Sequence, residues 1–248
     1  MIGGLITILC GCYTMEINLI DTSSIWKKSG EMNQNEEIKH CDGVNLSQTY
    51  KTFLWLWSKC GTTHMKTVLD RFDFKFYQLK NNKLSLKNSS IVHEHNCIIF
   101  PEHENYKLLA AIRNPYSRFF SEFVSTNNNE KFESNPQNKD KFSIHLENIL
   151  MRGYRLSNNC CDFFDRKPDY PIRVENLFED YSKIPFIVDS DYYKSGRLEE
   201  ITKSKINDSN NYEGLWKNYY TQQTADMVYY RMPRYFEIFG YDKNSWLE

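Results

Sequence analysis

Residues 52–69, TFLWLWSKCGTTHMKTVL, decide most of what the sequence predicts about the fold. The apolar and aromatic part, TFLWLW, is an unbroken run of the kind found in strands that are buried on both faces. The polar turn SKCGTT follows, and Met65, Val68 and Leu69 then recur at helical spacing. This stretch therefore predicts a strand, a tight turn and a helix in succession.

The rest of the chain repeats this alternation. Apolar runs predict strands at residues 90–92, 107–112 and 170–174, and helical periodicity predicts helices after Pro115, over 142–151 and over 221–240. Pro115 suits the first turn of a helix because its missing N–H has no partner there in any case. Polar segments at 127–141 and 203–211 lie between these elements. Strands that alternate with helices predict an α/β domain with a central parallel sheet covered on both faces.

Composition limits the classes of partner. The chain has 248 residues, of which 40% are hydrophobic and 25% charged, so it can bury a substantial core. Lys and Arg number 31 against 32 for Asp and Glu, a net charge of −1. Such a balance provides no overall field for nucleic acid or an anionic membrane, so we expect no nucleic-acid partner. Any bound anion has to be held by a local site.

The amino-terminal part gives expectations about domains and location. Residues 1–50 are expected to be a lead-in, either flexible or part of the same unit, and residues 51–248 a single domain. The apolar segment 2–13 is too short to span a bilayer, and the first basic residue is Lys27, so it does not resemble a signal peptide. A buried strand or a misassigned start codon accounts for this segment better than a signal peptide does. We therefore expect a cytoplasmic chain with no membrane span.

Cysteine usage points away from a metal centre. The seven cysteines are an odd number, and none of their spacings matches a zinc site. Reduced cysteines without a disulfide framework are the expectation, which agrees with a cytoplasmic location.

The turn Lys59-Cys60-Gly61-Thr62-Thr63 has the chemistry of a phosphate-binding loop. Glycine lets backbone N–H groups approach an anion, and the helix amino terminus adds the positive end of its dipole. Because the dipole contributes only about 0.3–1 kcal/mol, Lys59 has to supply the main charge. Lysine precedes glycine here, unlike the Gly-Lys-Ser/Thr order of Walker A loops. The alternative is an ordinary turn whose lysine faces solvent.

A second anion-binding pattern follows the strand predicted at 107–112. Arg113 comes directly after that strand, and Ser121 lies two helical turns further along. The planar guanidinium matches phosphate oxygens, and the serine hydroxyl adds a donor. Arg118, between them, is expected either to support the same phosphate or to pair with a carboxylate. Two anion sites at the carboxyl ends of parallel strands suit a ligand that carries two separated phosphates.

In these two motifs the sequence resembles the sulfotransferases that use 3′-phosphoadenosine-5′-phosphosulfate (PAPS). Their Lys-x-Gly-Thr-Thr/Ser motif binds the 5′-phosphosulfate and matches residues 59–63, with Ser58 where the family usually has proline. Their Arg-x-x-x-x-x-x-x-Ser motif binds the 3′-phosphate and matches Arg113 and Ser121. Weaker similarities are the Glu175-Asn-Leu segment and the closing helix, so that the resemblance covers about residues 52–242.

This resemblance implies a P-loop-like three-layer α/β/α domain and a reaction. A sulfuryl group would pass from PAPS to a hydroxyl group, with a carbohydrate as the expected acceptor and 3′,5′-ADP as the product, and no metal is required. Lys59 would stabilise the leaving phosphate oxygen, and His64, beside the loop, would contact the donor or lie on the helix surface.

The base that deprotonates the acceptor is expected within His93-Glu94-His95. In an extended segment His93 and His95 point to the same face, and Glu94 points away. This His-x-His resembles the catalytic histidines of heparan and related uronyl 2-O-sulfotransferases, and imidazole has a suitable pKa of about 6.5. The alternatives are that His93 packs structurally and that Glu94 is the base.

Two other functions stay open at the level of sequence. A small-molecule kinase would need ATP and Mg²⁺, and the order of Lys59 and Gly61 argues against it. A binding module that kept the nucleotide site without turnover would bind 3′,5′-ADP and transfer nothing.

Overall fold

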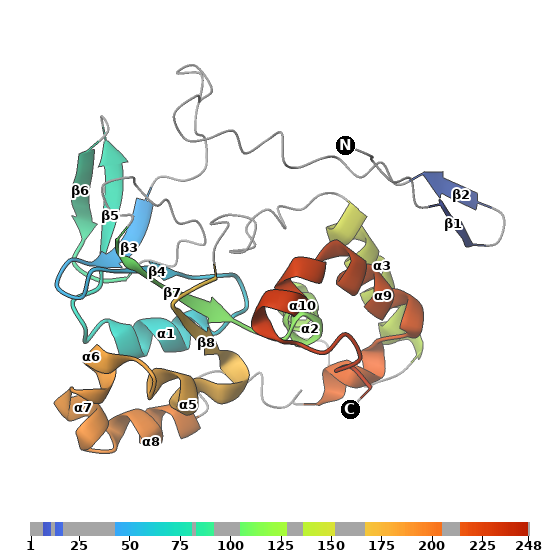
Figure 1. Cartoon of the computed structure of the whole chain (residues 1–248). Helices are drawn as coiled ribbons and strands as arrows, with labels where there is room; N and C mark the ends of the chain where they lie inside the picture. Colours follow the sequence, from blue (N-terminus) through green and yellow to red (C-terminus); the bar gives the residue numbers. More distant parts are fainter. Residues whose placement is uncertain are drawn as a thin grey trace. The chain divides into compact units, whose positions relative to one another are not determined.

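The computed structural model describes residues 7–10, 13–16, 43–80, 83–91, 105–127, 136–151, 167–204 and 214–247 (Figure 1). The chain divides into two compact units, residues 1–39 and residues 40–248. In the first unit, β1 (Thr7–Cys10) and β2 (Tyr13–Glu16) form an antiparallel pair, so a strand within the apolar segment is confirmed. All further description concerns the second unit.

A six-stranded sheet forms the centre of this unit, in the order β6-β5-β3-β4-β7-β8. Its strands are β3 (Gly43–Ser47), β4 (Thr52–Trp55), β5 (Lys75–Lys80), β6 (Lys83–Asn88), β7 (Lys107–Ile112) and β8 (Tyr170–Arg173). Strands β4, β7 and β8 are parallel, whereas β3, β5 and β6 pair antiparallel. The α/β class is confirmed, but a parallel arrangement holds for only one half of a mixed sheet.

The parallel half follows directly from the apolar runs. All of β4 is buried, and every residue of β7 after Lys107 is buried as well. Trp55 lies opposite Ala110 in the parallel register, so a large side chain is matched by a small one. Strands that are covered on both faces need such unbroken apolar sequences.

The strand predicted at 90–92 is wrong for Ser90 and Ile91, and Val92 lies outside the described residues. Ile91 is fully buried, which explains its apolar character without a strand. Its N–H donates to Asp70 Oδ1 at 2.9 Å instead of joining the sheet. Burial and sheet pairing are therefore separate properties at this position.

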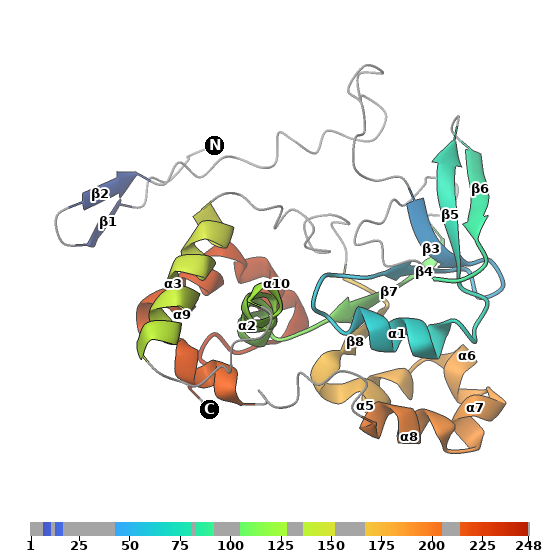
Figure 2. The same cartoon turned by 180° about the vertical axis from the view of Figure 1, so that it is seen from behind.

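One group of helices lies beside the parallel strands. Helix α1 (Thr62–Leu69) is next to the sheet, and the short helices α5 (Leu177–Tyr181), α6 (Pro185–Val188), α7 (Asp191–Lys194) and α8 (Arg197–Lys203) lie next to α1 (Figures 1 and 2). The Tyr181 hydroxyl donates to the Met65 sulfur at 2.9 Å, which joins α5 to α1. The helix predicted after Gly61 is thus confirmed.

A second group packs together beyond the carboxyl end of β7 (Figures 1 and 2). It comprises α2 (Pro115–Thr126), α3 (Pro136–Met151), α9 (Gln222–Arg231) and α10 (Pro233–Phe239). Aromatic rings join these helices, as in the pairs Phe123–Phe142 and Tyr116–Phe236, whose ring centroids are each 5.4 Å apart. Both groups and the sheet contribute to one hydrophobic core.

Two helix predictions need correction at their ends. Helix α3 begins at Pro136, so part of the predicted polar loop is helical. The predicted helix at 221–240 is two helices, because Pro233 has no N–H to continue α9 and begins α10 instead. Across the described residues, no helix combines the length and the apolar character that a bilayer crossing requires.

Candidate functional site

The carboxyl ends of the three parallel strands meet at one place. Strand β4 leads into the loop that contains Lys59, β7 leads into Arg113, and β8 leads into Val174. The Arg113 Nη1 donates to the Lys59 carbonyl oxygen at 3.2 Å. A Cβ built on Gly61 would lie 3.2 Å from Val174 Cγ2. The two predicted anion-binding motifs are therefore direct neighbours.

The backbone of the loop has an unusual conformation. Lys59 has φ of +63° and Gly61 has φ of +70°, both in the left-handed region. Left-handed residues in a turn direct successive N–H groups into a concave surface that suits an anion. The first backbone bond of α1 runs from the Met65 N–H to the Gly61 carbonyl at 2.9 Å. The N–H groups of Thr62, Thr63 and His64 therefore have no acceptor within the helix.

We expect Gly61→Ala to lower the free energy of unfolding by about 1–2 kcal/mol, because alanine is strained at positive φ. The close approach of Val174 adds to this cost. Urea unfolding is the measurement, and Gly196→Ala is the matched control, since Gly196 has φ of +78° and no atom within 4 Å of an added Cβ. Equal losses in both variants would show that the Val174 contact adds nothing.

The loop side chains differ in what they offer a ligand. Lys59 is partly exposed, and its ammonium group forms no hydrogen bond or ion pair with the described residues, so this group is available. Thr62 is partly buried and Thr63 is exposed. Cys60 is fully buried, and burial raises the pKa of its thiol to about 12. Cys60 therefore stays protonated at neutral pH, and it can contribute its backbone but not a thiolate.

His64 lies on the buried side of α1. It is 6% exposed, and its ring centroid is 6.0 Å from that of Tyr181. Burial lowers the pKa of His64 to about 4, so the imidazole is neutral at pH 7. The helix-surface alternative for this residue is wrong. Within the described part of the chain its Nε2 has no hydrogen-bond partner.

Arg113 is fixed by several contacts. Its Nε donates to Ser117 Oγ at 2.9 Å, in addition to the bond from Nη1 to Lys59. Burial lowers the pKa of Arg113, but an arginine keeps its charge throughout the physiological range. Ser121 is partly exposed and follows Ser117 by four residues, so both serines face the same side of α2. Ser117 is not among the residues predicted from the sequence, although the same helical spacing indicates it.

Arg118 contacts the two residues that precede Lys59. Its guanidinium lies 3.7 Å from the Trp57 ring centroid, and its Nε donates to the Ser58 carbonyl at 3.1 Å. The Nη2 forms an ion pair with Glu122 at 3.7 Å. Of the two predicted roles for Arg118, pairing with a carboxylate is confirmed. Arg118 thereby ties α2 to the residues that precede Lys59.

Side chains from distant parts of the chain fix the backbone after β7. The Tyr235 hydroxyl accepts from the Arg113 N–H and donates to the Arg113 carbonyl, both at 3.1 Å. Glu175 Oε1 accepts the Asn114 N–H at 2.7 Å, and its Oε2 accepts from the Tyr241 hydroxyl at 3.2 Å. Arg113 is consequently held on its side chain and on its backbone.

The predicted bases are not among the residues that the structure describes. His93, Glu94 and His95 fall outside the described residues, so their roles stay predictions. Within the described ranges, no group of three or more His, Cys, Asp or Glu side chains is placed to hold a metal ion.

Comparisons with known proteins give no relative. No family model, no curated protein and no solved structure matches this chain. The functional interpretation therefore depends on the residues and contacts described above.

Proposed function

We propose that this chain is a PAPS-dependent sulfotransferase that modifies a hydroxyl group, with a carbohydrate as acceptor. The observation that carries the proposal is the 3.2 Å bond from Arg113 to the Lys59 carbonyl. This bond joins the lysine loop after β4 to the arginine after β7. The lysine motif precedes the arginine motif in the chain, and the resemblance to the sulfotransferases rests on these two motifs. A P-loop-like three-layer α/β/α arrangement is part of the same proposal.

The residues present fit such a donor. The concave loop at Gly61, with the N–H groups that begin α1 and have no acceptor within the helix, suits the 5′-phosphosulfate. Arg113, with Ser121 two turns along α2, suits the 3′-phosphate, and Ser117 orients the guanidinium. Each phosphate would meet one cation and several N–H or O–H donors.

PAPS and the protein would contribute different parts of the reaction. PAPS supplies an activated sulfuryl group, whose S–O bond to phosphate breaks as the acceptor oxygen bonds to sulfur. Lys59 balances the negative charge that remains on the phosphate oxygen. The acceptor proton passes to the base predicted among His93, Glu94 and His95. Because charge is dispersed during such transfers, positioning and electrostatics account for most of the catalysis.

We expect Arg113→Met to weaken the binding of 3′,5′-ADP by about tenfold, because charge-assisted hydrogen bonds to the 3′-phosphate are lost. The affinity for 5′-AMP, which lacks that phosphate, should be nearly unchanged. Calorimetric titration of both nucleotides measures the difference. Arg231→Met is the matched control, since Arg231 is exposed on α9.

Three results would contradict the proposal in different ways. A wild-type chain that does not bind 3′,5′-ADP removes the nucleotide site altogether. If Arg113→Met weakened the binding of 3′,5′-ADP and of 5′-AMP equally, Arg113 would not contact the 3′-phosphate. Binding of 3′,5′-ADP without transfer of labelled sulfuryl group from PAPS to any acceptor in a glycan panel leaves a nucleotide-binding module, the alternative function.

A further inference from the structure

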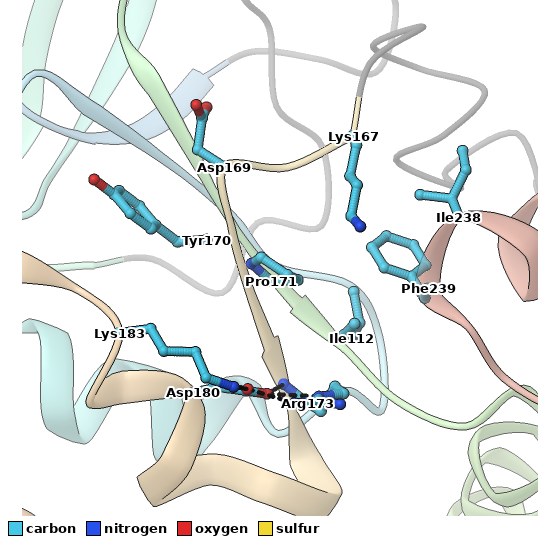
Figure 3. A pocket seen from close by; sticks show the side chains of 10 residues that line it. All are labelled: Ile112, Lys167, Asp169, Tyr170, Pro171, Arg173, Asp180, Lys183, Ile238 and Phe239. Carbon is cyan, nitrogen blue, oxygen red and sulfur yellow. Dashed lines mark hydrogen bonds and ion pairs between the residues drawn. The ribbon is translucent and has the colours of Figure 1, made fainter.

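A pocket of about 320 Å³ lies along β8, at the edge of the described sheet (Figure 3). Neither Lys59 nor Arg113 lines it, so it is separate from the loop site. Its apolar lining residues are Ile112, Pro171, Ile238 and Phe239. Its charged lining residues are Lys167, Asp169, Arg173, Asp180 and Lys183.

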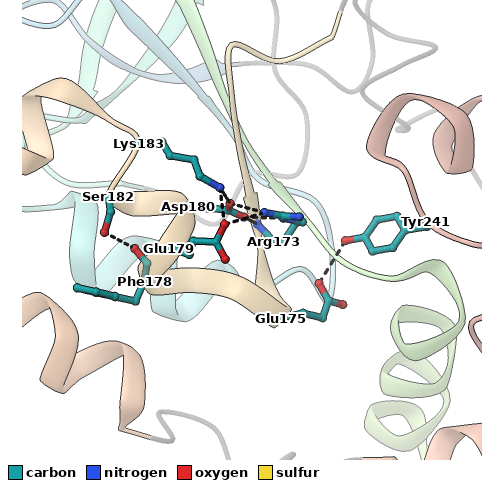
Figure 4. Close-up of polar contacts among 8 residues, drawn as sticks. All are labelled: Arg173, Glu175, Phe178, Glu179, Asp180, Ser182, Lys183 and Tyr241. Carbon is teal, nitrogen blue, oxygen red and sulfur yellow. Dashed lines mark hydrogen bonds and ion pairs between the residues drawn. The ribbon is translucent and has the colours of Figure 1, made fainter. Parts of the chain in front are cut away.

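The carboxylates of this pocket are already engaged. Asp180 accepts the Arg173 N–H at 2.9 Å, the Arg173 Nε at 2.8 Å and Nη2 at 2.6 Å, and the Lys183 Nζ at 3.0 Å (Figure 4). A carboxylate offers about four acceptor positions, so Asp180 has no capacity left. Asp169 accepts the Lys107 Nζ at 2.9 Å and a backbone N–H at 2.8 Å.

The cations, in contrast, keep unused donors. Lys167 is exposed and forms no hydrogen bond or ion pair with the described residues. Arg173 uses Nε and Nη2 on Asp180, and its Nη1 has no acceptor in the described part of the chain. Lys183 uses its ammonium on Glu179 and Asp180, which leaves one N–H of three. The spare polar capacity of the pocket is therefore positively charged.

The edge of β8 also limits what can occupy the pocket. Pro171 has no N–H, and the Arg173 N–H is taken by Asp180. These two residues share one side of the strand, because backbone groups alternate in direction along it. An added β-strand would find no N–H donor there, whereas a compact ligand needs none.

We infer that this pocket binds a small anion that carries an apolar ring, of which an aryl carboxylate is the simplest example. The ring packs on Pro171 and Phe239, and the carboxylate takes a hydrogen bond from the Lys167 ammonium group. A volume of about 320 Å³ suits a ligand of this size. The site is independent of the nucleotide loop and of the function proposed for it.

The test uses the full chain and para-fluorobenzoate, followed by fluorine NMR titration. Para-fluorobenzamide has the same shape without the charge and should bind at least about fivefold more weakly. Lys167→Met should weaken para-fluorobenzoate binding by about fivefold, and Lys167→Arg should restore it. Lys66→Met, on α1 and not among the residues that line the pocket, should change nothing.

Several outcomes would overturn the inference. They are no saturable binding of para-fluorobenzoate at millimolar concentration, equal affinity for the benzamide, or an unchanged affinity in Lys167→Met. Displacement of para-fluorobenzoate by 3′,5′-ADP would place the probe in the loop site instead. Because Lys167 is exposed, its variants should unfold at the wild-type urea concentration, which circular dichroism checks.

Discussion

Replacing Lys59 with methionine is expected to slow sulfuryl transfer, the activity proposed above, by about 100- to 1000-fold. Lys59 lies where the ends of β4 and β7 meet, and no described residue neutralises its ammonium group. Methionine keeps the length and apolar stem, and it is no more strained than lysine at φ of +63°. The variant therefore removes the charge and leaves the loop. Single-turnover transfer from labelled PAPS measures the effect.

The control for this experiment is Lys66→Met on the last turn of α1, which removes a lysine close in sequence but outside the loop. Its transfer rate should equal that of the wild type. Because ground-state contacts matter less than those to the leaving oxygen, Lys59→Met should weaken 3′,5′-ADP binding by only a few fold. A Lys59→Met variant with the wild-type transfer rate would exclude this lysine from the chemical step.

The second large effect concerns stability. Asp180→Asn is expected to lower the free energy of unfolding by about 3–5 kcal/mol, because it leaves the Arg173 guanidinium without its closest counter-charge. Asp180 is 4% exposed and the Arg173 side chain is 32% exposed, so water can replace only part of the lost interaction. The asparagine amide would also direct N–H donors at a group that has only donors. Urea unfolding followed by circular dichroism measures the change.

Lys183→Met serves as the comparison. The Lys183 side chain is 56% exposed, and its ion pair with Asp180 should contribute less than about 1 kcal/mol. A loss in Asp180→Asn no larger than the loss in Lys183→Met would show that the Arg173 pair contributes little.

The same pair predicts a pH dependence. Burial raises the pKa of Asp180, but hydrogen bonds from Arg173 and Lys183 outweigh it, and the pKa lies below the usual 3.8. A carboxyl with a depressed pKa in the folded state contributes its full stability above the pKa of the unfolded chain. That contribution should be lost as the pH falls below about 3.8, and the loss should be absent in Asp180→Asn.

Local patterns predicted the parallel half of the sheet and could not predict the other half. Strands β4 and β7 are unbroken apolar runs, and Pro115 marks the helix that follows. Strand β3 contains Asn45 and Ser47, which are buried although they are polar. Ser47 Oγ accepts the Tyr50 N–H at 3.2 Å, so burial is compensated by a bond that hydropathy does not reveal.

The candidate site, too, could be predicted from the sequence only in part. That the Lys59 loop lies beside Arg113 follows from the rule that parallel strands end at one edge of a sheet. The groups that fix Arg113 do not follow from it, since Tyr235 is 122 residues away and Glu175 belongs to another strand end. Such contacts are set by tertiary packing, and a single sequence carries no local pattern for them.

The two hydrogen bonds between the Tyr235 hydroxyl and the Arg113 backbone have a consequence for biosynthesis. A nascent chain exposes Arg113 long before the ribosome has made α10, so the arginine first emerges without the hydroxyl that fixes it. The phosphate site proposed at this arginine would therefore be complete only late in translation, after the segment that carries Tyr235 has docked.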